Sequence, residues 1–337
     1  MNIPDRLIAA YGLESGGTVT ALESFANRVY LYTLNNGEAY IIKQYKVLDA
    51  QGVRTLHANQ KRLRARGILI PEVLAGKDGD TVSELDGEVF DISRYVPHRN
   101  LNYQDYNISE EELTEVGRLL KTIHDTDPAT MDLEAVSFSD NGSGAESLIS
   151  DYRQWRMKSK VTGVDTKLAV IDEFLTRTES WRDSLSERFS AYTFTNTEPV
   201  VSHGDVSLVN LLPTGQGMYL IDWDKLKLRP PMYEVQRTIG LICGTGNVNG
   251  NLEEISKERL KPFVEGYFGN KGPSEGQVRQ LIEVAEYTSH LDWLRFTLGQ
   301  LLAGDFRVLE LLSDDTEQNF YWLRPDAFSR YREMLAG

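Results

Sequence analysis

The 337-residue sequence contains a single cysteine, Cys243, so no disulfide can form within the chain. Such scarcity is typical of a protein in a reducing compartment. Cys243 lies in the apolar segment TIGLICG, where a buried structural thiol is favoured over a nucleophile. The sequence also lacks a basic leader and any apolar run of about 18 residues, which argues against secretion and membrane insertion. We therefore expect a cytoplasmic protein with no membrane partner.

Positive charge is in short supply as well. The chain has 36 Lys and Arg against 50 Asp and Glu, which gives a formal net charge of −14. The field of such a protein repels nucleic acid, so no nucleic-acid partner is expected. The five histidines are scattered along the sequence and give no support for a zinc site. The length exceeds what one small core accommodates and indicates about two domains.

The first hundred residues predict a small antiparallel sheet with one helix. Residues 28–46 have the pattern of a β-hairpin, because two β-rich segments flank the turn sequence NNG. A helix is expected over 50–66, where Gly67 ends the apolar periodicity. Two further strands are expected over 70–77 and 87–96, separated by a segment rich in turn residues.

The remainder of the chain is predominantly helical in pattern. Helices are expected over 109–125, 147–160, 166–190, 252–268, 275–303 and 315–335. Between them, the segments PVVSHGD and NLLPTGQGMYLIDWD predict a short β patch. The predicted fold class is α+β. It has a small antiparallel-sheet lobe over 1–96, a connection near 93–99, and a larger helical lobe over 97–337. A cleft between two lobes is a common place for a small-molecule site.

Four polar residues of the β segments occur in the order that phosphoryl transfer from a nucleotide needs: Lys43, Asp205, Asn210 and Asp222. The sequence His203-Gly204-Asp205 with Asn210 has the spacing of the H-R-D-x-x-x-x-N loop of protein kinases. A lysine can neutralise the α- and β-phosphates, and carboxylate and amide oxygens are ligands for Mg²⁺. A further aspartate can accept the proton of an attacking hydroxyl. These residues predict a kinase-type site.

With these motifs, the chain resembles the aminoglycoside phosphotransferase and choline kinase superfamily over nearly its whole length. The segments that carry the resemblance are FANRVYLYTLNNGEAYIIKQYK, LRARGILIPEVL, EVGRLLKTIHD, VSHGDVSLVNLL and MYLIDWDKLKLRPPMYEV. The resemblance implies a two-lobed protein-kinase-like fold with ATP, and in some members GTP, in the cleft. It implies that the lobe over 1–96 binds the nucleotide and that the lobe over 97–337 carries catalysis and acceptor binding. It also implies that Asp205 is the catalytic base, that Asn210 and Asp222 bind Mg²⁺, and that Lys43 binds the nucleotide phosphates.

Two other segments are predicted to contact the nucleotide. The resemblance implies that SRYVPH is the hinge, where the backbone of Arg94 and Val96 reads the nucleobase. The nucleotide loop ESFANR has no glycine, so Ser24, Asn27 and backbone N–H groups would have to cradle the phosphates. Asp224 follows the predicted metal ligand by two residues, and the sequence leaves open whether it binds metal or faces solvent.

The sequence departs from the family at the small-lobe helix. Family members usually place there a Glu that pairs with the phosphate-binding lysine, but no acid occurs between Gln51 and Gly67. His57, Asn59 and Gln60 are the polar residues available, and the partner of Lys43 is left open.

The function predicted from these patterns is transfer of the γ-phosphoryl of ATP, or GTP, to a hydroxyl of a small acceptor such as an aminoglycoside, amino sugar or amino alcohol. The missing acid leaves an alternative, a weak or inactive kinase-like protein that binds or has a structural role. A cationic acceptor would be attracted by acids of the last hundred residues, although solvated faces of an acidic protein are the favoured interpretation. These acids are Glu283, Glu286, Asp292, Asp305 and Glu310. We also expect Glu234 to cap or brace the catalytic loop and His203 to orient it.

Overall fold

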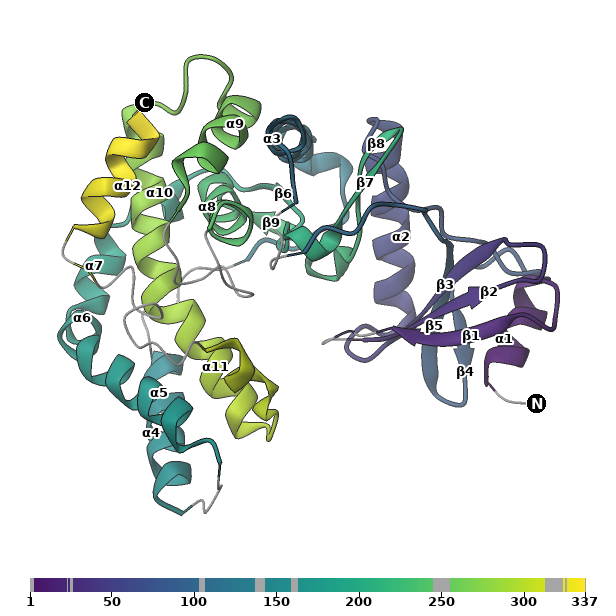
Figure 1. Cartoon of the computed structure of the whole chain (residues 1–337), viewed down its shortest axis with the longest axis horizontal. Helices are drawn as coiled ribbons and strands as arrows, with labels where there is room; N and C mark the ends of the chain where they lie inside the picture. The colour runs from purple at the N-terminus through teal and green to yellow at the C-terminus, as the bar shows by residue number, and fades with distance from the viewer. Residues whose placement is uncertain are drawn as a thin grey trace. The chain divides into compact units, whose positions relative to one another are not determined.

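A computed structural model describes residues 3–22, 24, 27–102, 107–136, 143–158, 163–244, 255–312, 324 and 326–336. The chain forms two compact units (Figure 1). The first unit comprises residues 1–100, 126–133 and 209–226, and the second comprises 101–125, 134–208 and 227–337. A lobe boundary after residue 96 stays a prediction. The predicted α+β class, with a small antiparallel sheet and a mainly helical remainder, is confirmed.

The first unit is built on a five-stranded antiparallel sheet with the strand order β1-β2-β3-β5-β4. Its elements are α1 (Ile3–Tyr11), β1 (Thr18–Leu22), β2 (Arg28–Thr33), β3 (Ala39–Tyr45), α2 (Ala50–Ala65), β4 (Ser83–Leu85), β5 (Glu88–Arg94), β7 (Leu211–Thr214) and β8 (Gly217–Leu220). Strands β7 and β8 form a separate hairpin. The predicted hairpin over 28–46 is therefore present as β2 and β3, and the predicted helix over 50–66 is α2.

The alternation of side chains along β3 gives the sheet two different faces. Tyr40 and Ile42 lie on one face, where they join a buried cluster with residues of α1. Lys43 and Tyr45 lie on the other face. There the helix α2 contributes His57, which contacts Asp91 of β5. One face is thus an apolar core, and the other carries the polar groups of the candidate site.

The second unit is mainly helical. Its elements are α3 (Glu110–His124), α4 (Ser143–Lys158), α5 (Asp165–Arg177), α6 (Glu179–Asp183), α7 (Leu185–Ala191), β6 (Val200–Ser202), β9 (Lys227–Arg229), α8 (Pro231–Ile242), α9 (Lys257–Phe268), α10 (Glu275–Tyr287), a π-helical turn (Thr288–Asp292), α11 (Trp293–Leu302) and α12 (Ala327–Ala336). Strands β6 and β9 pair as a two-stranded antiparallel sheet. The predicted buried thiol is confirmed, because Cys243 is fully buried at the end of α8. No helix in the described part of the chain is long and apolar enough to cross a membrane.

The helices α3 and α9 cross at very short range. A Cβ on Gly117 of α3 would lie 2.4 Å from the carbonyl oxygen of Phe263. A Cβ on Gly266 of α9 would lie 2.2 Å from the carbonyl oxygen of Thr114. The two glycines therefore let the helix backbones approach each other, and this contact fixes α3, whose last residue is His124.

Some predicted elements are wrong. The strand expected over 70–77 is reduced to a single bridge, Val73 with Ser93. Pro71 has no N–H to donate to a ladder, and the N–H groups of Gly76 and Lys77 donate to the carbonyls of Asp80 and Ala10 instead. The helix expected over 166–190 is divided into α5, α6 and α7. Thr178 and Ser184 stand at the two breaks, where their hydroxyl groups donate to backbone carbonyls.

Two other helix predictions are met only in part by the structure. The helix expected over 252–268 is present as α9, which begins at Lys257, and 251–254 lie outside the described residues. The helix expected over 315–335 is present as α12, and 313–323 also lie outside the described residues. The predicted helices over 109–125 and 147–160 are α3 and α4, and 159–160 lie outside the described residues. The one over 275–303 contains the π-helical turn between α10 and α11.

Candidate active site

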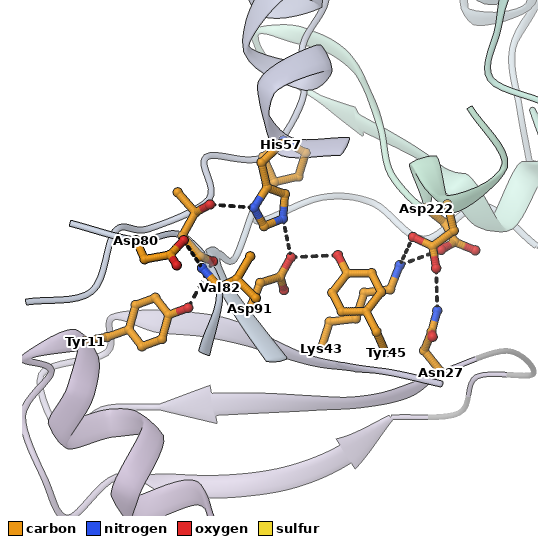
Figure 2. Close-up of polar contacts among 12 residues, drawn as sticks. Tyr11, Asn27, Lys43, Tyr45, His57, Asp80, Val82, Asp91 and Asp222 are labelled. Carbon is orange, nitrogen blue, oxygen red and sulfur yellow. Dashed lines mark hydrogen bonds and ion pairs between the residues drawn. The ribbon is translucent and has the colours of Figure 1, made fainter. Parts of the chain in front are cut away.

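Lys43 lies near the end of β3, and its ammonium group lies between two carboxylates (Figure 2). The Nζ atom donates to Oδ1 of Asp222 at 2.8 Å and to Oδ1 of Asp224 at 2.7 Å. These carboxylates, 179 and 181 residues further along the chain, follow strand β8. The predicted phosphate-binding lysine and one predicted metal ligand are therefore brought together in the first unit. The partner of Lys43 that the sequence left open is this pair of aspartates.

The charge of Lys43 is stabilised although the side chain is largely buried. Burial alone would lower the pKa of Lys43, but the charges of Asp224 and Asp222 and their hydrogen bonds raise it above the ordinary value. The side chain of Lys43 is 15% exposed, compared with 36% for Asp222 and 20% for Asp224. The group is therefore a fixed cation near the end of the central strand of the sheet, with part of the surrounding carboxylate surface open to solvent.

Asp222 has an unusual backbone conformation for a residue other than glycine. Its φ is 63° and its ψ is 59°, which is the left-handed region. The short turn that follows, Trp223–Lys225, is anchored by Trp223, which is buried and donates its Nε1–H to the carbonyl of Leu220 at 2.9 Å. Non-glycine residues in this region are uncommon and concentrate at functional sites. The backbone and the buried indole together fix the direction of the two aspartates.

Asn27 binds the second aspartate of this pair. Its Nδ2 donates to Oδ2 of Asp224 at 2.7 Å, and its Oδ1 accepts from the backbone N–H of Lys46 at 3.3 Å. Asn27 is buried, whereas Ser24 is exposed and its hydroxyl accepts from the backbone N–H of Asn27 at 3.5 Å. Of the predicted nucleotide loop ESFANR, residues 23, 25 and 26 lie outside the described residues. Asp224 does not face away into solvent, because both of its oxygens have partners within the unit.

Asn210 lies immediately before β7 and is connected to the turn that bears the aspartates. It is buried, and its backbone carbonyl accepts from the N–H of Ile221 at 3.0 Å. Ile221 is the residue directly before Asp222. The hairpin of β7 and β8 therefore holds the two predicted metal ligands on neighbouring strand ends. Arg94 and Val96 lie at and after the end of β5, where the Arg94 N–H donates to Glu72 and the Val96 carbonyl accepts from His98.

Asp205 belongs to the second unit, in the loop after β6. Its backbone N–H donates to Nδ1 of the fully buried His203 at 3.2 Å, so the histidine is bonded to the loop as predicted. Gly204 has a φ of +85°, and the guanidinium of Arg229 lies where a side chain would begin. Burial lowers the pKa of Arg229, against the opposing charges of Glu234 and Asp205. A cation from strand β9 therefore lies beside the candidate base.

Glu234 braces this loop, as the sequence predicted. One of its oxygens accepts from the backbone N–H of Gly204, and the other accepts from Nε2 of His124 at 2.8 Å. Nδ1 of His124 is 2.7 Å from the hydroxyl of Tyr267, so both ring nitrogens have partners. Burial would raise the pKa of Glu234, but the hydrogen bond and charge of His124, together with His203 and the Gly204 N–H, lower it to about 2.

Sequence reasoning did not identify His124 and Tyr267. The segment TIHD belongs to a family motif, but nothing in its sequence indicates that the histidine is a buried hydrogen-bond partner of Glu234.

The acids considered for a cationic acceptor are mostly engaged inside the second unit. Glu286 accepts hydrogen bonds from Trp181, Arg188 and Tyr192. Glu283 accepts from the backbone of the turn at residues 193 and 194. Asp292 accepts from the hydroxyl of Tyr233 at 2.6 Å, and Asp305 pairs with Arg307. These contacts explain Glu283, Glu286 and Asp292 as structural groups. Glu310 is exposed, as the solvated interpretation expects.

The donor set at the candidate site consists of hard oxygens. Within the described residues, no group of three or more His, Cys, Asp or Glu side chains is arranged to hold a metal ion. Asp222 and Asp224 nevertheless direct oxygens at one cation, the ammonium of Lys43. Two carboxylates that converge on a single cation, with an amide on the adjoining strand end, have the chemistry that Mg²⁺ prefers.

A sequence model of phosphotransferase enzymes matches residues 18–268 of this chain, which includes the lysine, the His-Gly-Asp loop and both aspartates. The chain belongs to the phosphotransferase enzyme family. This membership confirms the predicted resemblance and the predicted class of enzyme, a phosphotransferase acting on hydroxyl groups. No curated protein matches the chain at a significant level.

Solved structures of several phosphotransferases and kinases are similar in fold to this chain. A spectinomycin phosphotransferase in complex with ADP and spectinomycin is 18% identical, with a TM-score of 0.70 over 98% of this chain and 97% of that one. An amicoumacin kinase in complex with AMP-PNP and Ca²⁺ is 14% identical, with a TM-score of 0.62 over 97% and 92%. A choline/ethanolamine kinase family protein from Mesorhizobium loti is 16% identical, with a TM-score of 0.60 over 99% of both chains. This phosphotransferase therefore has the kinase-like fold that its motifs predicted.

Proposed function

We propose that this phosphotransferase transfers the γ-phosphoryl group of ATP, with GTP as the other candidate donor, to a hydroxyl of a small molecule in the cytoplasm. The observation that carries the proposal is the ammonium of Lys43 held between Asp222 and Asp224. Family membership and the H-G-D-x-x-x-x-N loop support the same reaction.

In this proposal the first unit binds the nucleotide. Lys43 neutralises charge on the α- and β-phosphates as the nucleotide displaces it in part from its two aspartates. Ser24 and Asn27 provide hydroxyl and amide groups at the loop that covers the phosphates. The backbone of Arg94, the last residue of β5, and that of Val96 contact the nucleobase. Neighbours solved with ADP and AMP-PNP support a nucleotide donor.

Asn210 and Asp222 would hold Mg²⁺, with Asp224 as a further carboxylate nearby. Bound Mg²⁺ supplies neutralisation of the charge on the phosphate oxygens during transfer. The residues fit this ion because their donors are hard oxygens and because both carboxylates already direct oxygens at a cation. The neighbour with Ca²⁺ and AMP-PNP supports a divalent ion at this type of site.

Asp205 is the proposed catalytic base. The acceptor oxygen forms a bond to the γ-phosphorus as the bond from that phosphorus to the β-phosphate oxygen breaks, and ADP leaves. The proton of the acceptor hydroxyl passes to the carboxylate of Asp205. Glu234 and His203 hold the loop that presents this carboxylate. The guanidinium of Arg229 lies beside Gly204 and places a positive charge next to this loop.

An amine-bearing acceptor, such as an aminoglycoside, amino sugar or amino alcohol, is the finer proposal. The neighbours named for spectinomycin and for choline or ethanolamine support this class. The internal contacts of Glu283, Glu286 and Asp292 do not add to it, because these acids already have partners.

The test is release of ADP from Mg-ATP, and of GDP from Mg-GTP, against a panel of hydroxylated acceptors. The panel contains aminoglycosides, amino sugars, choline, ethanolamine, homoserine and methylthioribose. We expect release that depends on one acceptor class and that is lost in the Asp205→Asn variant, which should still bind nucleotide. A near-normal rate in that variant would remove Asp205 from the role of base.

The same experiment can also show that the protein binds nucleotide without catalysing transfer. It would show a Mg-ATP-dependent rise in melting temperature and no acceptor-dependent release with any compound. The absence of both effects at millimolar nucleotide would contradict the proposed function altogether. The sequence feature behind this alternative, a lysine without an acid on the small-lobe helix, is weakened by the two aspartates that hold Lys43.

A further inference from the structure

A buried carboxylate that the proposed mechanism does not use lies opposite Lys43. Asp91 of β5 is the cross-strand partner of Lys43 in β3, and the residue is 5% exposed. Its Oδ2 accepts from the hydroxyl of Tyr45 at 2.7 Å and lies 2.9 Å from Nε2 of His57 (Figure 2). A buried acid needs hydrogen-bond partners to be tolerated, and these two side chains supply them.

Tyr45 connects this carboxylate to the lysine. The Nζ atom of Lys43 lies 4.9 Å from the centroid of the Tyr45 ring, which is within the range of a cation–π contact. Tyr45 is two residues after Lys43 on the same face of β3, so the ring flanks the lysine side chain. The ring of Tyr45 therefore contacts the ammonium of Lys43, and the hydroxyl of Tyr45 donates to Asp91.

His57 connects the same carboxylate to α2. Its Nδ1 is 2.8 Å from the hydroxyl of Thr81, and its Nε2 faces Asp91. The histidine is buried on α2, and the sequence has no acid between Gln51 and Gly67. The helix thus reaches the site through an imidazole, a carboxylate and a phenol, where kinases commonly have a direct lysine–glutamate pair.

We propose that Tyr45 is a positioning residue for Lys43, and that Asp91 and His57 hold its hydroxyl so that the ring stays beside the lysine when nucleotide is bound. The inference rests on the proposed function, because it assigns Lys43 to nucleotide phosphates. In this arrangement Tyr45, Asp91 and His57 together take the place of a carboxylate on α2.

The electrostatics favour this arrangement. A phenol that donates to a carboxylate has a more electron-rich ring, which strengthens attraction to a cation over its face. Burial and the charge of Asp91 raise the pKa of Tyr45 well above its ordinary value, so the hydroxyl remains a donor throughout the working range of pH. When phosphates compete with Asp222 and Asp224 for the ammonium, the contact with Tyr45 is retained because Tyr45 and Lys43 belong to the same strand, β3.

The first test measures Mg-ATP affinity by calorimetry in Tyr45→Leu, which removes the ring, and in Tyr45→Phe, which removes only the hydroxyl. We expect affinity to fall about tenfold in Tyr45→Leu and about threefold in Tyr45→Phe. The matched control is Tyr152→Phe. Tyr152 is also buried and also donates to a carboxylate, Asp172 at 2.9 Å, but it lies on α4 in the second unit. That variant should lose stability and keep its Mg-ATP affinity.

The link to α2 is tested by two substitutions of His57. His57→Gln retains an N–H donor for Asp91, and His57→Leu does not. We expect His57→Leu to weaken Mg-ATP binding about threefold and His57→Gln to restore most of the loss, while the acceptor KM is unchanged in both. Equal effects on nucleotide and acceptor would indicate a merely structural role and would overturn the assignment.

A second measurement needs no nucleotide. In a double-mutant cycle on the melting temperature, Tyr45→Leu should lower stability less in a Lys43→Met background than in the native chain, because the contact is already lost. Additive effects would overturn the inference whether or not the protein binds ATP. If the native chain gave no response to Mg-ATP, the proposed function would fail, and this cycle would still decide whether Tyr45 holds the lysine. Unchanged Mg-ATP affinity in Tyr45→Leu would overturn the inference alone.

Discussion

Gly204 of the His-Gly-Asp loop should not tolerate a side chain. Its φ of +85° disfavours any other residue, and an added Cβ would lie 2.8 Å from Nη1 of Arg229. Displacing Arg229 would also break its hydrogen bonds to Ser202 and remove a cation from beside Asp205. We expect Gly204→Ala to lower kcat at least tenfold, measured as acceptor-dependent ADP release.

The control for Gly204→Ala is Gly163→Ala. Gly163 has a φ of +87° and no atom within 4 Å of an added Cβ. Both variants should lose about 1 kcal/mol of stability from the left-handed backbone, because that cost is independent of the surroundings. Only Gly204→Ala should lose activity. Equal kcat values in the two variants would contradict the role assigned to Arg229 and to the tight loop.

His290 should make stability depend on pH. Burial lowers the pKa of His290 from 6.5 to about 4. The hydrogen bond with the backbone of Glu286 and the charge of its carboxylate oppose this shift, and the charges of Arg188 and Arg182 add to it. Between these pH values the unfolded chain binds a proton that the folded chain does not. Stability should therefore fall by roughly 3 kcal/mol as pH falls from 6.5 to 4.

The measurement for His290 is the free energy of urea unfolding at pH 5.0 and pH 6.5. In His290→Phe the aromatic stacking on Trp181, at 4.6 Å between ring centroids, can be retained without a titrating group. We expect this variant to lose less stability between the two pH values than the native protein. Equal losses would assign the acid sensitivity to other groups, such as the many carboxylates.

At the scale of elements, the crossing of α3 and α9 depends on two glycines. Gly266→Ala would place a Cβ 2.2 Å from the carbonyl oxygen of Thr114, and backbone cannot move as a side-chain end can. We expect a loss of about 2–4 kcal/mol. Gly299→Ala in α11, where an added Cβ meets no atom within 4 Å, should instead gain about 0.5–1 kcal/mol from helix propensity. Thermal unfolding of both variants checks the prediction, and a Gly266→Ala protein as stable as the native one would contradict it.

Elements with strong local signals could be predicted from the sequence. The NNG hairpin and α2 were, because turn chemistry and apolar periodicity act over a few residues. The residues 18–22 were missed as strand β1, whose five residues are all exposed and show no apolar alternation. Helix α8 was also missed, since its buried polar residues, Glu234 among them, mask the periodicity.

Site residues could be predicted where the chemistry requires a fixed spacing along the sequence. Site residues whose role depends on tertiary contacts could not. The spacing of Asp205 and Asn210, and Asp222 after an apolar strand, follow from motifs within a few residues. The contacts of His57 with Asp91 and of His124 with Glu234 join residues 34 and 110 positions apart. No local pattern distinguishes a buried histidine that braces a carboxylate from one in a core, so these residues could not be identified from the sequence.

At the scale of the molecule, the first unit is assembled from three segments that are far apart in the chain. The backbone N–H of Leu220 donates to the carbonyl of Leu69 at 3.0 Å. The buried side chain of Asn59 donates to the carbonyl of Asp132 at 2.9 Å and accepts from its N–H at 3.1 Å. Residues 1–100 alone therefore lack partners for groups that are buried in the complete unit.

We expect a fragment of residues 1–100 to show no cooperative thermal transition, because each buried polar group left unpaired costs about 1–3 kcal/mol. A synthetic peptide of residues 209–226 should restore part of the order, since it returns the β7–β8 hairpin and the carboxylates of Asp222 and Asp224 to Lys43. The same peptide with Asp222→Asn and Asp224→Asn should bind more weakly and with less dependence on salt, because it lacks the two charges. Circular dichroism melts with each peptide measure these effects. Cooperative melting of the bare fragment at the temperature of the intact chain would show that the distant segments are dispensable, and equal rescue by both peptides would remove the carboxylate pair from the assembly of the unit.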